Sequence, residues 1–305
     1  MSQAQVKITP LARVLANKKN IDITLIKGSG FNGKIYESDV INYKPSKVAD
    51  LSATFVDKNS NISASSMMGE LVAKREKINF VRKAIAKAMK NSWANVAYVN
   101  LKHRVNVSKL WDIRKEIKDD VKAEKNVNLT FLAFVVKAVT LALKEFPIFG
   151  AKYDEKTEEI VYPNAVNIGI AVDTDHGLFV PVIKDADQKS VVEIAAEIVS
   201  LAKAARDKNL KPAQMQGATF TITNYGSVGS LHGLPVINYP EIGILGLGAI
   251  VDEAFYSATE KKLVAGKAMY LTTAADHRWI DGSTIGRFTT RVANLLEKPS
   301  LLGVY

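Results

Sequence analysis

The sequence contains no cysteine among its 305 residues. This absence excludes a disulfide-stabilised scaffold, a zinc site built from thiolates and a catalytic cysteine. Any thiol chemistry must therefore use a thiol that a substrate brings, and we expect no metal site in the chain.

Long apolar runs are also missing. The best candidate, 130–146, is interrupted by Lys137 and falls short of the roughly 18 apolar residues that span a bilayer. The N-terminus has neither the apolar stretch of a signal peptide nor the Arg-rich amphipathic segment of a transit peptide. We expect a protein of the bacterial cytoplasm that does not bind membranes.

Arginine is scarce although the net charge is +10, because most of the 41 basic residues are lysines. No arginine cluster of the kind that holds nucleic-acid phosphates or bases is visible in the sequence. The positive charge favours an anionic partner, which includes nucleic acid, a phosphorylated cofactor and an acidic protein surface. Nucleic-acid binding rests on charge alone, and we do not expect it.

Composition divides the chain into three parts. Residues 1–44 suit a very small helical domain, in which Thr9 caps a first helix that begins at Pro10. Residues 45–69 are rich in Ser, Asn, Lys, Ala and Pro and lack apolar periodicity, which indicates a flexible linker. Residues 70–305 form one large domain.

The small domain has a minimal predicted core. Leu11, Leu15 and Val14 are expected on the apolar face of its first helix, and Val40 and Ile41 are expected on that of its second. The loop 28–33 reads Gly-Ser-Gly-Phe-Asn-Gly, which formally matches a dinucleotide fingerprint. That fingerprint requires a strand before it and a long helix after it, and neither is predicted. We therefore interpret the loop as a compact turn in which glycine permits positive φ.

In the large domain, apolar patterns predict helices and strands that mix without strict alternation. The predicted helices are one that begins near residue 80 and those at 110–125, 129–145, 190–207 and 283–297. The predicted strands are 96–107, 219–223, 242–249 and 268–275, with a hairpin whose arms are 166–173 and 178–183. The fold class is therefore α+β.

The chain has four histidines, and one of them is placed for chemistry. His103 and His176 are expected in solvent, and His232 lies in a loop without an assigned role. His277 ends a predicted strand and precedes a helix, a position from which a loop presents a side chain to a ligand. The alternative is that His277 is a core residue and that Asp281 or Ser283 merely caps the helix.

Residues 276–282 read Asp-His-Arg-Trp-Ile-Asp-Gly and resemble the HxxxDG signature of the dihydrolipoamide acyltransferases, which chloramphenicol acetyltransferase shares. Further segments that resemble this family, in the same order, are 82–89, 167–173, 177–183, 220–226 and 235–241. The segment 9–40 resembles the family's peripheral-subunit-binding domain. The resemblance implies a chloramphenicol-acetyltransferase-like catalytic domain, preceded by that small helical domain.

The family moves an acyl group between dihydrolipoyl-lysine and coenzyme A. A free thiol has a pKa of about 8.5, and an imidazole with a pKa of about 6.5 suits the removal of its proton. The resemblance makes His277 the expected general base, with burial keeping the ring neutral. Thr223 stands where most relatives carry Ser, and its hydroxyl is expected to stabilise the oxyanion by about 3–4 kcal/mol.

Asp281 is the third site residue that the signature implies. It follows His277 by four residues in a loop, where contact with the imidazole is not required. Its carboxylate could polarise His277, cap the last helix or form an ion pair. We favour a structural ion pair, with Arg82 as its partner.

The resemblance also implies assembly and partners. Homotrimers with the active site between subunits are expected to build a larger cubic or icosahedral core. Residues 8–43 are expected to bind dihydrolipoamide dehydrogenase, the 2-oxo acid decarboxylase or both, because basic residues steer onto an acidic partner surface. Arg13 and Lys34 match the family's basic contact positions, whereas Asn17 stands where relatives often carry another Arg.

Two departures from the family pattern matter. The sequence shows no lipoyl domain, so the lipoyl group is expected from a further domain or from another chain in trans. Residues 272–275 read Thr-Thr-Ala-Ala in place of the more usual hydroxyl- and aromatic-bearing residues, which affects how the His277 loop is supported.

Alternatives stay open at the level of the reaction. The acyl group is acetyl if the resemblance of 224–230 and 235–249 to pyruvate dehydrogenase acetyltransferases holds, and succinyl or branched-chain otherwise. A non-catalytic scaffold would keep the fold and the docking domain without turnover. The presence of His277 and of a hydroxyl at Thr223 argues against a scaffold.

Overall fold

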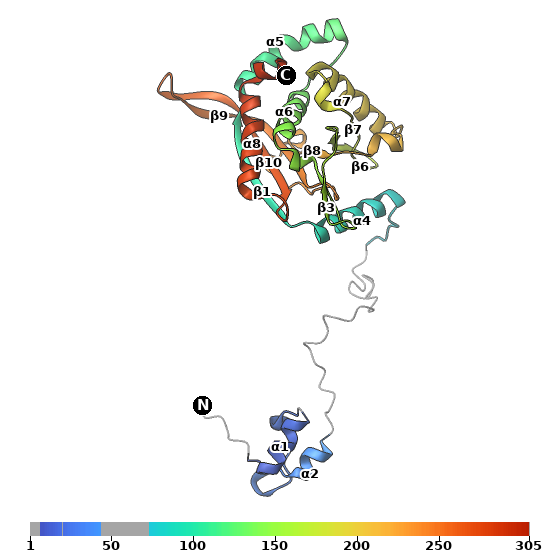
Figure 1. The fold of residues 1–305 in the computed structure, drawn as a ribbon, viewed down its shortest axis with the longest axis vertical. Coiled ribbons are helices and arrows are strands. Elements are labelled where there is room, and N and C mark those ends of the chain that lie inside the picture. The colour runs from blue at the N-terminus through green and yellow to red at the C-terminus, as the bar shows by residue number, and fades with distance from the viewer. Residues whose placement is uncertain (1–6, 20, 44–72, 305) are drawn as a thin grey trace. The chain divides into compact units, whose positions relative to one another are not determined.

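Figure 1 shows the fold, a computed structural model that describes residues 7–19, 21–43 and 73–304. The chain divides into two compact units, Met1–Glu76 and Lys77–Tyr305, and each unit has its own hydrophobic core. The linker predicted at 45–69 lies outside the described residues.

Short helices form the N-terminal unit. They are α1 (Pro10–Lys18), η1 (Ile23–Leu25), η2 (Phe31–Gly33) and α2 (Glu37–Asn42). As predicted, Thr9 caps α1, because its hydroxyl accepts a hydrogen bond of 3.3 Å from the N–H of Ala12. Asp39 fixes the start of α2 by accepting hydrogen bonds from the N–H groups of Tyr36 (2.8 Å) and Ser29 (3.0 Å). These bonds to its ionised form lower the pKa of Asp39.

The core of this unit differs from the predicted one. Leu11 is 62% exposed and Ile41 is 56% exposed, whereas Ala12, Ala16 and Val40 are fully buried. The prediction is therefore wrong for Leu11, Val14 and Ile41, and it is confirmed for Val40 and for Leu15, which packs against this core. Helix α1 turns Ala12 and Ala16 to the rest of the unit and packs Leu15 beside them, so Leu11 lies outside the buried face.

The glycine loop is a compact turn, as interpreted from the sequence. A Cβ on Gly28 would lie 2.4 Å from the carbonyl oxygen of Gly33, and one on Gly30 would lie 2.5 Å from the ring of Tyr36. Gly33 itself has a φ of +71°, which glycine adopts without strain. The loop joins two short helical turns, so the dinucleotide fingerprint is not supported.

The helices of the C-terminal unit agree with the predicted ones. They are α4 (Phe80–Asn95), α5 (Ser108–Lys125), α6 (Phe131–Glu145), α7 (Val191–Arg206) and α8 (Gly282–Glu297), with 3-10 turns η4 (Pro147–Gly150), η5 (Ala186–Gln188), η6 (Pro212–Met215), η7 (Gly226–Val228) and η8 (Pro299–Gly303). Helix α6 is buried from 133 to 143. A capping box starts α7: the Ser190 hydroxyl accepts from the N–H of Glu193 at 3.3 Å, and the Ser190 N–H donates to the Glu193 carboxylate at 2.8 Å.

The strands are β1 (Tyr98–Asn106), β2 (Lys152–Asp154), β3 (Glu159–Val161), β4 (Ile168–Ile170), β5 (Val172–Thr174), β6 (Gly177–Phe179), β7 (Val182–Ile183), β8 (Phe220–Asn224), β9 (Gly243–Ser257) and β10 (Lys262–Asp276). One mixed sheet has the order β1-β10-β9-β8-β4-β7, in which β8 runs parallel to β4 and β9 and the other neighbours are antiparallel. The pairs β2-β3 and β5-β6 form small ribbons. The predicted α+β class is confirmed.

The two faces of the large sheet have different coverings. Phe220 and Ile222 of β8 point into the main core with residues of α6, α7 and α8, and α8 packs over β1 and β10 (Figure 1). Because side chains alternate along a strand, Thr221 and Thr223 point to the opposite face. That face is covered in part by the segment 225–241 and α4.

Two predicted strands are longer in the structure. Strands β9 and β10 continue as an antiparallel ribbon through 250–268, where Tyr256 pairs with Leu263, and the ribbon projects from the sheet in Figure 1. Tyr256 is 67% and Leu263 is 70% exposed, so this part buries no apolar run that could have predicted it. The predicted hairpin at 166–183 is confirmed, but β4 and β7 join the large sheet while β5 and β6 form a separate ribbon.

A matched pair of glycine variants tests the packing of this loop. Gly28→Ala places a methyl group against backbone and is expected to unfold the N-terminal unit, whereas Gly33→Ala meets no atom within 4 Å and should cost only about 1 kcal/mol through its positive φ. Hydrogen exchange of α1 and α2 in the full chain measures the difference. Equal protection in both variants would contradict the tight packing of this turn.

Candidate active site

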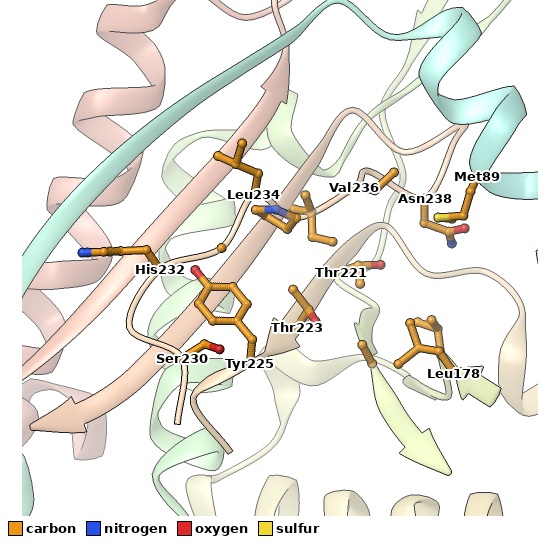
Figure 2. A pocket seen from close by; sticks show the side chains of 15 residues that line it. Met89, Leu178, Thr221, Thr223, Tyr225, Ser230, His232, Leu234, Val236 and Asn238 are labelled. Atoms are coloured by element: carbon orange, nitrogen blue, oxygen red, sulfur yellow. The ribbon is translucent and has the colours of Figure 1, made fainter. Parts of the chain in front are cut away.

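A cavity of about 420 Å³ lies on the face of the sheet opposite α6 to α8 (Figure 2). Its apolar wall includes Met89, Leu178, Val180, Leu234 and Val236, and its polar groups include Thr221, Thr223, Ser230 and Asn238. Among the described lining residues, none carries a Lys, Arg, Asp or Glu side chain. The cavity therefore suits an uncharged and largely aliphatic ligand.

Thr223 lies at the centre of this cavity on β8, and Thr221 points into it from the same strand (Figure 2). The wall beside Thr223 is formed by Tyr225, whose ring leaves no room for a side chain at Gly246, because a Cβ there would lie 2.6 Å from it. The Tyr225 hydroxyl donates a hydrogen bond of 3.0 Å to the hydroxyl of Thr272 on β10. Thr272 thus supports the wall of the Thr223 cavity.

His277 lies in the turn between β10 and α8, which an ion pair and a backbone hydrogen bond hold in place. Asp276 is 2% exposed, and the Arg278 guanidinium donates to its carboxylate from Nε, 3.0 Å from each oxygen, and from Nη2 at 2.6 Å. This pairing raises the pKa of Arg278. The backbone is tied to β1 as well, because the His277 N–H donates to the carbonyl of Ala97 at 2.7 Å. The turn therefore presents His277 from a fixed position.

Pairing register determines how far His277 lies from Thr223 within one chain. Thr223 is paired with Gly246 and Gly246 with Thr272, whereas His277 follows Thr272 by five residues. Five strand residues and two strand spacings correspond to about 20 Å between Cα atoms. A single chain does not bring the two side chains together. The His277 side chain is also exposed, so the burial expected for it is absent within one chain.

Asp281 is the residue from which α8 starts. Its carbonyl accepts hydrogen bonds from the N–H groups of Thr284 (2.9 Å) and Ile285 (3.0 Å), while its carboxylate makes no capping bond. The predicted ion pair with Arg82 is absent from the single chain, as is any other ion pair of Asp281 within the described residues. Both side chains are exposed to solvent.

The remaining histidines differ in environment. His103 was expected in solvent, but it is half-buried on the helix-facing side of β1, with Nε2 3.4 Å from the Thr290 hydroxyl, and burial lowers its pKa. His176 is exposed in a turn, as predicted. His232 lines the cavity, and its ring meets that of Tyr270 edge to face with 4.6 Å between the centroids.

Glu241 is a site residue that the sequence analysis did not single out. It is 3% exposed, and its carboxylate accepts hydrogen bonds from the Thr221 hydroxyl at 2.6 Å and from the Asn238 amide at 3.0 Å. Burial raises the pKa of Glu241 to about 7. Its position, as the single acidic residue in the apolar stretch 234–249, is the signal that could have indicated it.

The predicted partner-binding residues lie on the surface of the N-terminal unit. Arg13 on α1 and Lys34 after η2 are both exposed. Exposure is a condition for contact with a partner protein. Their role in binding stays a prediction.

Within the part of the chain that the structure describes, no group of three His, Asp or Glu side chains is placed to hold a metal ion. The same part contains no helix with the length and hydropathy of a membrane span.

Comparison with known families gives two matches. Residues 71–304 match the family model "2-oxoacid dehydrogenases acyltransferase (catalytic domain)", and residues 6–41 match the "e3 binding domain". The chain is 41% identical over 298 residues to the dihydrolipoyllysine-residue acetyltransferase component of the pyruvate dehydrogenase complex of Bacillus subtilis. That alignment covers 96% of this chain and 67% of the relative.

Solved structures agree with these matches. A probable dihydrolipoamide acetyltransferase from Listeria monocytogenes superposes with a TM-score of 0.71 at 37% identity, covering 74% of this chain and 94% of its own. The structure described as the cubic core of the pyruvate dehydrogenase multienzyme complex superposes with a TM-score of 0.72 at 33% identity, covering 76% of this chain and 96% of its own. The predicted resemblance and fold are confirmed, and the chain belongs to the 2-oxoacid dehydrogenase acyltransferase family.

Proposed function

We propose that the chain transfers an acetyl group between dihydrolipoyl-lysine and coenzyme A, as the core-forming subunit of a pyruvate dehydrogenase complex in the bacterial cytoplasm. The match of 71–304 to the acyltransferase catalytic domain carries this proposal, and the bacterial relatives named as acetyltransferases support acetyl as the group transferred. Residues 70–305 form the catalytic domain, 1–44 the peripheral-subunit-binding domain and 45–69 the linker. The lipoyl group comes from another domain or chain.

In the proposed mechanism His277 is the general base. Its imidazole takes the proton of the attacking thiol, and the thiolate adds to the thioester carbonyl. The Thr223 hydroxyl donates a hydrogen bond to the oxyanion of the tetrahedral intermediate. When the intermediate collapses, the other thiolate leaves and takes the proton back from His277, so the base is restored.

Two chains build each site in this proposal. The separation of about 20 Å between Thr223 and His277 within one chain is too large for both side chains to act on one thioester. A trimer solves this when the Asp276-to-Ile280 turn of one subunit faces the Thr223 cavity of the next. The likeness to a cubic core supports trimers within a larger assembly. Asp281, which starts α8, acts on the orientation of this turn in our proposal.

The shared site generates a complementation test. His277→Ala and Thr223→Val should each lower kcat by about 10²–10³-fold, because each removes one group of the reacting centre. When the two variants are co-assembled in equal amounts, about one site in four combines an intact His277 with an intact Thr223, so about a quarter of wild-type activity should return. Separately assembled variants that are mixed afterwards are the control. Failure of co-assembled chains to regain activity would contradict a site shared between subunits.

The acyl group is tested with the same assay. Transfer to free dihydrolipoamide should be faster from acetyl-CoA than from succinyl-CoA or isobutyryl-CoA by at least about tenfold in kcat/KM, because specificity is a difference in transition-state binding. Faster transfer from either of the other two donors would replace acetyl by that group. No transfer from any donor by folded, assembled protein would favour the non-catalytic scaffold.

Arg13 and Lys34 are tested in partner binding. Arg13→Ala and Lys34→Ala should each weaken the binding of dihydrolipoamide dehydrogenase about tenfold, and less at high salt, because they lose a charge that faces an acidic surface. Lys18→Ala removes an equal charge from the last turn of α1 and is the control. Calorimetric titration measures the three affinities. Equal losses in all three variants would show net charge rather than specific contacts.

A further inference from the structure

Glu241 is buried, and none of the residues that the structure describes serves as its counter-ion. The acidic side chains buried in the described residues are Glu241 and Asp276, and Asp276 is paired with Arg278. Glu241 forms no ion pair within the described parts of the chain. The positive charge of Lys152 on β2 acts to lower the pKa of Glu241. Burial of a carboxylate without such a partner destabilises a fold, and an apolar residue of similar size would pack at lower cost. Packing alone therefore gives no reason for a carboxylate at this position.

Both donors to Glu241 are side chains of the cavity wall. The Thr221 hydroxyl donates to Oε2 at 2.6 Å, and the Asn238 amide donates to Oε1 at 3.0 Å. Thr221 precedes Thr223 by two residues on the same face of β8, and Asn238 belongs to the segment 225–241 that covers this face (Figure 2). One carboxylate thus connects the strand to the segment that covers it.

The surroundings leave the Thr221 hydroxyl little freedom. It faces the bare backbone of Gly169 on β4, where a Cβ would lie 2.9 Å from the hydroxyl oxygen and 2.9 Å from a methyl group of Val180. The hydroxyl is therefore confined between β4 and Glu241. A hydroxyl has a single proton to donate, so the hydrogen bond to Glu241 fixes the orientation of the Thr221 side chain in the cavity wall.

From this geometry we propose that Glu241 is a positioning residue of the acyl-transfer site. Its carboxylate holds Thr221 and Asn238 in the wall that receives the thiol-bearing arm of a substrate. The inference rests on the proposed function, which supplies two such arms, the dihydrolipoyl chain and the pantetheine chain of coenzyme A. Both arms are uncharged and end in a thiol, which agrees with a cavity whose described lining has no Lys, Arg, Asp or Glu.

Ionisation of Glu241 changes what it can hold. The ionised carboxylate accepts from both donors, whereas the protonated acid and an amide each offer fewer accepting oxygens and have a proton of their own to donate. Burial raises the pKa of Glu241 to about 7, while Thr221, Asn238 and Lys152 favour the ionised form. The arrangement of the wall is therefore fully formed on the alkaline side of neutral pH.

The test uses the assembled protein and five variants, one of which is the double variant that combines Glu241→Gln with Thr221→Val. Glu241→Gln removes the charge at nearly constant volume, Thr221→Val removes the hydroxyl, and Thr221→Ser restores it. Thr289→Val is the matched control, because Thr289 is a buried hydroxyl on α8 that donates to Thr273 at 2.7 Å, outside the cavity. Steady-state kinetics at pH 8 gives KM and kcat with dihydrolipoamide and with coenzyme A varied separately. Calorimetric titration gives the affinity for each without turnover.

We expect Glu241→Gln and Thr221→Val to raise the KM and the dissociation constant of dihydrolipoamide or coenzyme A about tenfold, with kcat changed less than about threefold. The substrate affected identifies the arm. The double variant should bind the substrate no more weakly than the single variant with the lower affinity, because the two side chains act through one network. Thr221→Ser should recover most of the lost affinity, and Thr289→Val should bind as the wild type does.

Several outcomes would overturn the role of Glu241. They are wild-type affinity for both substrates in Glu241→Gln and Thr221→Val, additive losses in the double variant, or a loss confined to kcat. If Glu241→Gln does not assemble, Thr221→Val and Thr221→Ser carry the test. Wild-type protein that binds the substrates but transfers no acyl group would count against the proposed function, and the affinities would still test Glu241.

The dependence on pH separates positioning from a structural role. Because the pKa of Glu241 is raised in the fold, proton binding stabilises the folded state, and this contribution is lost as the pH rises from about 4.5 through about 7. The Tm of the wild type should therefore fall more between pH 5.5 and pH 8 than that of Glu241→Gln. At pH 8 the variant should be at least as stable yet bind more weakly, and the affinity difference should narrow at pH 6. Parallel losses of stability and affinity in the variant would indicate a structural role only.

Discussion

Side chains along the strands of the large sheet alternate between two faces, and every other part of the catalytic unit depends on this alternation. On β8, Phe220 and Ile222 join the core beneath the helices, while Thr221 and Thr223 face a cavity. A shift of one residue in register would exchange the two sets and destroy core and cavity together. The hydroxyls of Thr221 and Thr223 can therefore face the cavity only because Phe220 and Ile222 anchor the strand in the core.

The second constraint is the turn that carries His277. It combines a buried ion pair between Asp276 and Arg278 with a backbone bond to β1, so its geometry is fixed before any partner is present. The cavity around Thr223 is likewise formed within one chain, by Tyr225 and its bond to Thr272. Each half of the proposed site is preorganised, which limits the ordering that assembly must supply.

Features that depend on local sequence could be predicted, and those that depend on tertiary approach could not. The Thr9 cap, the buried α6 and the placement of His277 before a helix follow from periodicity, capping and turn chemistry. Burial of Ala12 in place of Leu11 is decided by how closely other elements approach α1. Glu241 was missed for the same reason, because its hydrogen bonds to Thr221 and Asn238 join segments that are separate in the sequence. The β9–β10 ribbon left no clear apolar signal, since Tyr256 and Leu263 on one of its faces stay exposed.

The distance between Thr223 and His277 also has a consequence for a subunit before it assembles. If the site is shared between subunits as proposed, a newly synthesised subunit that has not met its neighbours holds two incomplete half-sites and does not hydrolyse or transfer thioester. On the same proposal, catalytic competence appears by mass action at the concentration where subunits associate, and it disappears on dilution. Turnover would then report quaternary structure, as a consequence of the register of one sheet.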